Sequence, residues 1–460
     1  MNPNPGDTNY LHTTKKTIAF AKRGMTITAL TSALALGLAV SGDAPAFASG
    51  SSIVSALSRK YAGESITVLL PPWGDMPKSE LAKFTAKTGI KVTLTSIAWG
   101  SIHDKVVASE AAGVAPADIT EVDWSWVGQF GRAGWYTNED SLLPQSLFKS
   151  SPVAPIFKYN GKQIAMPYNI DFRSMIVNMT DLNKAGITSP PRTWTQLKND
   201  AAKLKAKGIV KNPIGMQLGV GEDTSTGWYQ LIKAAGGEVL NAKDEPAFSS
   251  PNSAGAKAMT FIATLYKDGL VTPGEITDTT GDPTAPNFEA NLTAFVLDGS
   301  PGSLAQMKDP KVSKVAKDNI EIVPTPTPSA SIPSTTFGLP EGLGILKQAK
   351  NKAACAMFIL WWEQYPQLLY SYDSPNMGNL PPITSAIHKL SSTGKLVDGS
   401  EVEKILPGVK PLFANGAPVW YPEFSTDAAT EINAVAEGHA SVNSAISTLV
   451  SETKSLNSAS

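Results

Sequence analysis

Three short apolar runs, separated by two stretches with helical spacing, constrain the possible folds of this chain more than any other feature. The runs cover residues 66–70, 90–97 and 117–122. The first has the composition of a buried strand, and the second alternates in the way that a strand does. Strand, helix, strand, helix, strand over this distance predicts a parallel sheet with right-handed crossovers. The sequence therefore predicts an α/β fold.

The two stretches between those runs carry signals for helix ends. We expect a helix at Ser79–Thr88, which Gly89 ends. Ser101 and Asp104 have the spacing of a capping box, which predicts the start of a second helix that ends near Gly113.

The loops at the carboxyl ends of the predicted strands carry the first candidate binding residues. Ligands of parallel sheets bind beyond those ends. Trp73 and Asp75 follow the first run, and Asp123 and Trp124 follow the third. An indole covers the apolar face of a sugar, and a carboxylate accepts strong hydrogen bonds from its hydroxyls. In a single such pair, the tryptophan more often packs in the core and the aspartate more often caps a helix. Two pairs at one sheet edge favour a binding site for a polyhydroxyl ligand.

The bulk composition excludes several classes of function. The 460 residues are enough for two or more domains, and 39 basic against 40 acidic residues give no support for nucleic-acid binding. Cys355 is the one cysteine, so an intramolecular disulfide and a cysteine-based zinc site are excluded, and its apolar surroundings predict a buried thiol. No phosphate-binding loop is present, and we expect no cofactor, no metal and no catalytic residue.

The N-terminus has the pattern of a cleaved signal peptide at residues 1–48. A basic region is followed by the apolar stretch Met25–Val40 and by Ala46-Phe47-Ala48, which fits the small-x-small cleavage rule. The alternative is a membrane anchor, but about 16 apolar residues are few for a span. No cysteine lies at the cleavage site, which argues against a lipoprotein.

Residues 160–197 have the pattern of a chain crossing from one lobe to another. Gly161 predicts a short hairpin, and Pro167 prevents a helix across the join. Further on, Asn178 predicts the start of a short helix that Gly186 ends. Thr193 predicts the start of the next helix, in a capping box with the glutamine three residues later.

The remaining predicted elements follow from the same local signals. They are a strand at Ile214–Leu218, a polar turn at 222–226, a helix from Gly227, a helix capped by Asn252 and ended by Gly269, and an apolar helix from Asn351.

The crossing stretch resembles the extracellular solute-binding proteins of ABC importers, and in particular the sugar-binding group that includes maltose-binding protein. It holds G-K-x-x-A-x-P, then D-x-R, then A-G-I-x-x-P-P-x-T-W in that order. The resemblance implies a two-lobe periplasmic-binding-protein fold of type II, in which each lobe is a sheet flanked by helices and several crossings form a hinge. It places the N-terminal lobe at 63–166 plus 325–378, and the C-terminal lobe at 167–324 plus 379–460.

The resemblance extends to residues 63–457 and implies further ligand contacts in the cleft. Trp228 precedes a Gly-Gly pair. Ser300 lies in a turn after a strand that the resemblance predicts at Phe288–Leu297, and Glu341 lies in a predicted strand at Gly338–Leu346 that resembles the family's G-G-x-G segment. For Trp228, a place in the hydrophobic core is an equally good interpretation. Trp420 is our preferred residue for stacking against a sugar ring. With the loop residues, the predicted ligand-binding set is Trp73, Asp75, Asp123, Trp124, Asp171, Arg173, Trp228, Ser300, Glu341, Trp420 and Tyr421.

Two departures from the family pattern argue against assigning a specificity for maltose to this chain. No tryptophan follows the turn at Ser300, which leaves small polar contacts by Ser300 and Ser303, and no arginine follows Leu380-Pro381. Arg173 could pair with Asp171 or reach an anion such as glycerol phosphate.

The expected function is that of a monomeric periplasmic protein that binds a carbohydrate or polyol and delivers it to the inner-membrane subunits of an ABC permease. The alternatives are binding of glycerol phosphate or another non-sugar solute, a receptor-signalling role, and a glycoside hydrolase that uses Asp123 and Asp171 as acid and base.

Overall fold

The first sheet has five strands in the order β2-β1-β3-β12-β6. The computed structural model describes residues 53–278, 284–374 and 377–460, and the predicted signal peptide lies outside them. Strands β2 (Lys91–Ser96) and β3 (Ile119–Asp123) run parallel to β1 (Ser65–Leu70) on either side of it. Strand β12 (Glu341–Ile345) is antiparallel to both β3 and β6 (Met166–Pro167). The predicted parallel sheet is therefore confirmed, with an antiparallel pair added at one edge.

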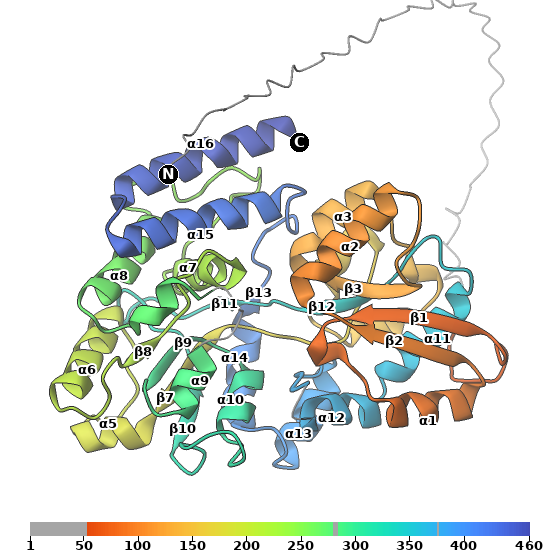
Figure 1. The fold of residues 1–460 in the computed structure, drawn as a ribbon, viewed down its shortest axis with the longest axis horizontal. Coiled ribbons are helices and arrows are strands. Elements are labelled where there is room, and N and C mark those ends of the chain that lie inside the picture. Colours follow the sequence, from red (N-terminus) through yellow and green to blue (C-terminus); the bar gives the residue numbers. More distant parts are fainter. Residues whose placement is uncertain (1–52, 279–283, 375–376) are drawn as a thin grey trace, which may run out of the picture. The chain divides into compact units, whose positions relative to one another are not determined.

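Helices cover this sheet on both faces (Figure 1). They are α1 (Lys78–Thr88), α2 (Trp99–Ala111), α3 (Val127–Ala133), α4 (Gln145–Lys149), α11 (Lys352–Trp362) and α12 (Tyr365–Asp373). Gly89 ends α1 in the left-handed region, as predicted. The predicted capping box at Ser101 and Asp104 is wrong, because α2 has already begun at Trp99 and the amide of Ser101 donates to the carbonyl of Ala98.

The core beneath the first sheet is built around α11. Its residues Phe358, Trp361 and Trp362 are buried together with Phe84 of α1. The Cys355 thiol is fully buried in the same cluster, as predicted, and burial raises its pKa far above the ordinary range.

The second sheet has four strands in the order β10-β7-β9-β8. Strand β7 (Ser174–Asn178) lies antiparallel between β10 (Ile320–Val323) and β9 (Phe295–Gly299), and β8 (Ile214–Gly215) runs parallel to β9. The strand predicted from Phe288 begins only at Phe295, because residues Thr284–Glu289 form helix α9.

Local capping chemistry sets the helix boundaries around this sheet. Asn178 caps α5 (Met179–Ala185), Gly186 ends it, and Thr193 caps α6 (Trp194–Ala206) in a complete capping box with Gln196, all as predicted. Two predictions are wrong in their starting points. Helix α7 (Glu222–Ala234) includes the predicted polar turn, and Ser253 rather than Asn252 caps α8 (Ala254–Lys267).

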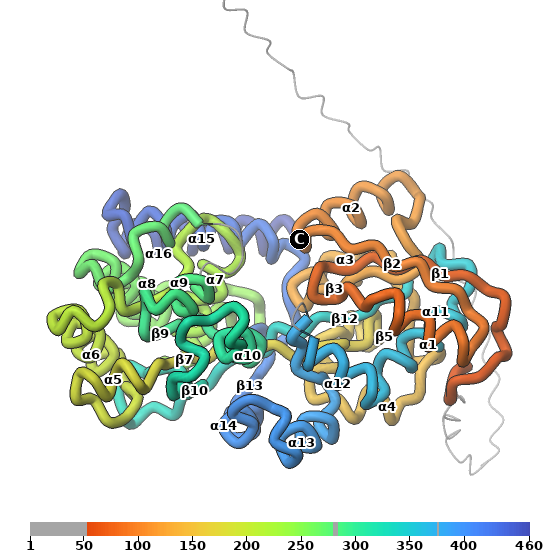
Figure 2. Tube along the Cα trace, turned by 60° about the horizontal axis from the view of Figure 1, so that its bottom comes forward, coloured from red at the N-terminus to blue at the C-terminus, as the bar shows by residue number. Residues whose placement is uncertain are grey.

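The remaining helices complete this part of the chain. They are α10 (Pro301–Met307), α13 (Thr384–Ser392), α14 (Gly399–Ile405), α15 (Tyr421–Glu437) and α16 (Val442–Ala459). Helices α15 and α16 lie beside α7 and α8 in both views (Figures 1 and 2), and the four share one apolar core with Trp228 and Phe424. Strands β11 (Thr336–Phe337) and β13 (Val409–Lys410) form a separate parallel pair.

The chain passes between the two sheets along three segments. The first links β6 to β7, the second links β10 to β12, and the third follows α12. The hairpin predicted at Gly161 forms just before the first segment, from β4 (Lys158–Tyr159) and β5 (Lys162–Gln163). Two helix-flanked sheets joined by repeated crossings confirm the predicted two-lobe fold.

Candidate functional site

A cavity of about 770 Å³ is lined by loops of both sheets and by the segments that connect them. This volume lies within the range of small-molecule sites. From the first sheet the lining includes Trp73, Trp99, Asp123, Trp124 and Glu341, and from the second Glu222, Asp223, Thr226, Ser300, Ser303 and Gln306. The connecting segments add Asn169, Asp171, Arg173, Leu339, Met377 and Asn379.

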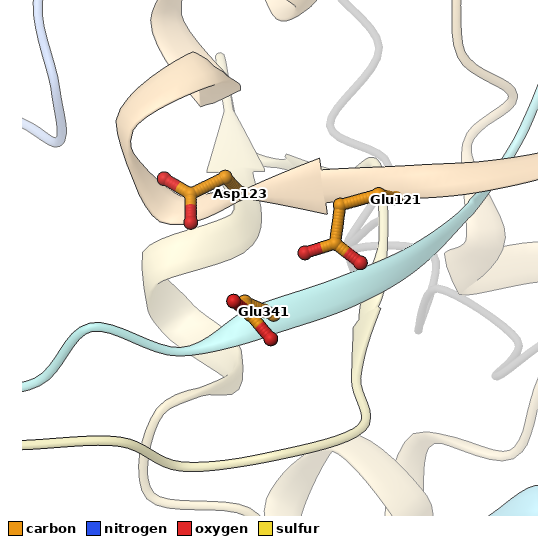
Figure 3. A group of neighbouring side chains, drawn as sticks. All are labelled: Glu121, Asp123 and Glu341. Carbon is orange, nitrogen blue, oxygen red and sulfur yellow. The ribbon is translucent and has the colours of Figure 1, made fainter. Parts of the chain in front are cut away.

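Three carboxylates meet at the first-sheet wall of the cavity. Glu121 and Asp123 are two residues apart on β3, so their side chains leave the same face of the strand. Glu341 is the cross-strand partner of Asp123 on β12. An oxygen of each carboxylate lies within 4.8 Å of one from each of the other two (Figure 3). This spacing can hold a cation, and without one it brings together three groups of the same charge.

The carboxylate of Glu341 is the hydrogen-bonded centre of this group. Its Oε2 accepts from the indole nitrogen of Trp73 at 2.5 Å, from the Tyr168 hydroxyl at 2.9 Å and from the Asn169 amide at 2.5 Å. Burial raises the pKa of Glu341 to about 7, while these hydrogen bonds oppose the rise by favouring the ionised form. Glu341 therefore changes its charge near neutral pH.

Asp123 and Glu121 differ in the partners that the fold gives them. Asp123 Oδ1 accepts from the amide of Ser125 at 2.8 Å and from the Ser125 hydroxyl, whereas neither oxygen of Glu121 has a hydrogen-bond partner among the described residues. Burial, followed by the Glu341 charge, raises the pKa of both carboxyl groups well above their ordinary range. The nearby Tyr168 hydroxyl, which donates to Glu341, opposes the rise in the pKa of Glu121. Glu121 is fully buried, and this burial favours the neutral, protonated form of its carboxyl group.

Glu222 is the corresponding carboxylate on the second-sheet side. It is the first residue of α7 and accepts from the Tyr421 hydroxyl at 2.5 Å and the Ser425 hydroxyl at 2.6 Å. Burial raises the pKa of Glu222 to about 7, against the effect of these two hydrogen bonds.

Arg173 is the one cationic side chain among the described residues that line the cavity. Its guanidinium contacts Asp171 at 3.3 Å and Asp223 at 3.0 Å. The pairing with Asp171 was an open alternative from the sequence, and Asp223 is an added partner.

Three indoles supply the apolar part of the lining. Trp73 and Trp99 are half-buried, and Trp124 is 5% exposed. Trp99 stacks on Trp126 with ring centroids 4.9 Å apart, and Trp124 packs against Tyr421 at 5.1 Å. Rings held by such packing present fixed surfaces to a ligand.

The structure brings seven of the predicted ligand-binding residues to this cavity. They are Trp73, Asp123, Trp124, Asp171, Arg173, Ser300 and Glu341, and Ser303 joins them. The Ser300 hydroxyl also accepts from the amide of Ser303 as the cap of α10, so it has a structural role beside its place in the lining.

Four predicted residues do not reach the cavity. Trp228 is fully buried and donates to the carbonyl of Gly255, which is the core alternative. Trp420 packs edge-on against Phe424 one helical turn away and lines a separate hollow of about 200 Å³. Tyr421 lies behind Glu222, to which it donates, and Asp75 is exposed outside the cavity.

Sequence reasoning missed other residues of the site, and some had a readable signal. Trp99 follows the second predicted strand, so the rule that selected Trp73 and Trp124 applies to it as well. Glu121 is a charged residue inside a buried strand, which is itself unusual. Asn169 and Asn379 had no such signal, because connecting segments far apart in the chain place them.

Comparisons with known proteins agree with this fold. The sequence profile described as "Bacterial extracellular solute-binding protein" matches residues 75–362. A putative binding protein of Brucella abortus is 28% identical over 189 residues, which cover 40% of this chain and 45% of that protein. The match thus spans less than half the length of this relative.

Two solved structures share the fold over most of the chain. The solute-binding protein of an ABC transporter from Agrobacterium radiobacter K84, in complex with ribitol, has a TM-score of 0.74 at 20% identity, covering 86% of this chain and 99% of that one. Maltose-bound MalE3 of T. maritima also has a TM-score of 0.74, at 22% identity, covering 85% of this chain and 99% of that one.

In the part of the chain that the structure describes, no helix combines the length and the hydropathy that a membrane span requires. The family profile covers more than half of the chain, and the two-lobe fold agrees with it. This protein is therefore a member of the bacterial extracellular solute-binding protein family, as the sequence predicts.

Proposed function

We propose that this protein is the substrate-binding component of an ABC importer and that it captures a carbohydrate or a related polyol in the cavity. The observation that carries the proposal is the combination, in one cavity of about 770 Å³, of three indoles with carboxylates from both sheets. Indoles cover the C–H faces of a sugar ring, and carboxylates accept hydrogen bonds from its hydroxyls. The relatives bound to ribitol and maltose support this class of ligand.

The mechanism that we propose is capture by lobe closure. A ligand that contacts Trp73 and Asp123 on one side and Glu222 on the other is held better when both sides contact it at once. Such differential contact shifts the population toward the closed form. We assign the lobes to 63–166 plus 325–378 and to 167–324 plus 379–460, the bounds that the resemblance implies.

We further propose that the protein acts in the periplasm after removal of residues 1–48, as a monomer, and delivers its ligand to inner-membrane permease subunits. We propose no catalytic role. An anionic ligand such as glycerol phosphate is less well supported, because Arg173 is already shared between Asp171 and Asp223.

The test is a thermal-shift screen of the purified protein against monosaccharides, disaccharides, polyols, glycerol phosphates and amino acids. A ligand at a hundred times its Kd stabilises the native state by about 2.7 kcal/mol through mass action. We expect a shift with a sugar or polyol and no product on standing. A shift with a phosphate or an amino acid alone would refute the ligand class, and product formation would refute the binding role.

Two variants locate the site. Trp99→Ala and Asp123→Asn should each weaken binding at least tenfold, measured by isothermal titration calorimetry. Glu64→Gln, at an exposed position outside the cavity, is the control and should leave the Kd unchanged. Unchanged affinity in both cavity variants would place the ligand elsewhere.

A further inference from the structure

The charges that line the cavity are strongly unbalanced. Five carboxylates and one guanidinium face it: Asp123, Asp171, Glu222, Asp223, Glu341 and Arg173. Arg173 contacts Asp171 and Asp223. No lysine, arginine or histidine within residues 53–278, 284–374 and 377–460 forms an ion pair with Asp123, Glu341 or Glu121. The first-sheet wall therefore gathers carboxyl groups that have no cationic side chain of the described residues as an ion-pair partner.

The fold increases this imbalance instead of relieving it. Asp123 and Glu341 are directly opposed across β3 and β12, an arrangement that destabilises a sheet when both are charged. Behind them the fully buried carboxyl group of Glu121, for which the described residues supply no hydrogen-bond partner, is turned toward Glu341 (Figure 3). A buried polar group without a partner costs stability, so this wall is suited to a ligand that supplies positive charge or donors.

The apolar part of the cavity fits the same ligand. Trp73, Trp99 and Trp124 line it near the carboxylates, and Trp73 donates to Glu341 itself. The face of an indole attracts a cation, and aromatic rings with nearby carboxylates are a recurring way to bind an ammonium group.

We propose that the ligand of this cavity is an amine-bearing sugar or polyol whose ammonium group lies against Asp123 and Glu341. This inference rests on the proposed function and narrows its ligand class. The proposed ligand differs from the neutral polyhydroxyl ligand that the sequence suggested. The sequence alone does not show that carboxylates outnumber cationic side chains around the cavity.

The hydrogen bonds already present favour an ammonium group over a metal ion. Glu341 Oε2 accepts three hydrogen bonds and Asp123 Oδ1 accepts two, all from the protein. One oxygen of each remains for the ligand. An ammonium group has three donors to satisfy, whereas Ca²⁺ requires six to eight oxygen ligands and Mg²⁺ six.

The experiment compares matched ligands by isothermal titration calorimetry at pH 7.5. Three series are used: glucose with glucosamine and N-acetylglucosamine, cellobiose with chitosan disaccharide, and sorbitol with 1-amino-1-deoxysorbitol. Calcium chloride alone is a separate arm. In at least one series we expect the amine to bind at least tenfold more tightly than its neutral counterparts.

Two variants test whether the carboxylate wall causes the preference. In Glu341→Gln, the Kd of the neutral ligand should exceed the Kd of the amine by less than threefold. If Glu341→Gln does not fold, Asp123→Asn serves the same purpose. Glu64→Gln removes an exposed carboxylate away from the cavity and should leave the ratio unchanged.

Each other result overturns the inference. Neutral ligands that bind as tightly as the amines would refute it while leaving the proposed function intact. Failure of all sugars and polyols to bind would refute both. Stabilisation by calcium alone, with no binding of any amine, would make the carboxylate group a metal site instead.

Discussion

Replacement of Glu121 by glutamine should stabilise the unliganded protein at neutral pH. Glu121 is fully buried, and neither carboxylate oxygen has a hydrogen-bond partner among the described residues. The burial of this group, with Glu341 and Asp123 beside it, raises its pKa well above 4.5. Glutamine has the same shape, requires no proton, and can donate its amide hydrogens to the neighbouring carboxylates.

The magnitude follows from the linkage between protonation and folding. The folded state holds the proton of Glu121 more tightly than the unfolded state, so its contribution to stability falls as the pH rises above 4.5. Each pH unit is worth about 1.4 kcal/mol, so keeping this group protonated at pH 7.5 costs the native state at most about 4 kcal/mol. Because the carboxyl groups of Asp123, Glu341 and Glu121 titrate as a coupled group, we expect Glu121→Gln to raise the free energy of unfolding at pH 7.5 by at most this amount, about 4 kcal/mol.

The assay is urea denaturation of both proteins at pH 4.5, 6 and 7.5, with Glu64→Gln as the exposed control. The difference between Glu121→Gln and the wild type should be small at pH 4.5 and grow with pH. The control should show no such trend. A difference that does not depend on pH, or a variant that is less stable at pH 7.5, would refute the assignment of Glu121 as a buried protonated acid.

Three further predictions concern stability. Trp228→Ala should lower the free energy of unfolding by about 3–5 kcal/mol in urea denaturation, since the indole is fully buried, and a loss below 1 kcal/mol would contradict its place in the core. Thr193→Ala should cost about 1 kcal/mol in the same assay through loss of the cap of α6, whereas Thr193→Ser should cost little. Glu222 and Glu341 have pKa values raised to about 7, so the free energy of unfolding of the unliganded protein should fall as the pH rises from 4.5 to 7 and change less above pH 7. Because both side chains are half-buried, this fall should be well below its theoretical maximum. A rise in the free energy of unfolding across this pH range would contradict the prediction.

Local chemistry explains how much of the fold could be predicted. Asn178, Gly186 and Thr193 act on helix ends within a few residues of themselves, so their signals are complete in the sequence. The start of α7 was missed because its cap, Gly221, has no side chain to reveal it. The start of α2 was displaced for the same kind of reason, since Ala98 caps without a side-chain hydrogen bond.

The site was only partly predictable, because its centre depends on pairing between distant strands. Sheet-edge reasoning found Asp123 and the neighbouring Trp124, and the family resemblance added Glu341. The register that sets Glu341 opposite Asp123 joins residues more than two hundred positions apart, and no local pattern gives it. The prediction for Trp420 relied on resemblance alone, while its ring packs on Phe424 in the following helix turn.

The hydrogen bonds of Glu341 connect the charge of the cavity with the segments that join the two sheets. Tyr168 and Asn169, which both donate to Glu341, begin the first segment, and Glu341 ends the second. From the third segment, Asn379 donates to the carbonyl of Trp73 at 2.9 Å and accepts from Asn169 at 3.4 Å. Residues of the first connection thus donate directly to this carboxylate, and Asn379 of the third connection contacts two of its donors, Trp73 and Asn169.

Tyr168→Phe tests this connection without changing the lining of the cavity. The Tyr168 side chain is fully buried and does not line the cavity, and its hydroxyl helps to keep Glu341 ionised. Loss of that donor should raise the pKa of Glu341, so binding of an amine ligand should need a higher pH to reach full strength. The measurement is the pH profile of the Kd between pH 5.5 and 8 for the wild type and the variant. A merely structural role of Tyr168 would weaken binding equally at every pH, whereas a role through Glu341 moves the midpoint of the profile upward and leaves the Kd at pH 8 nearly unchanged.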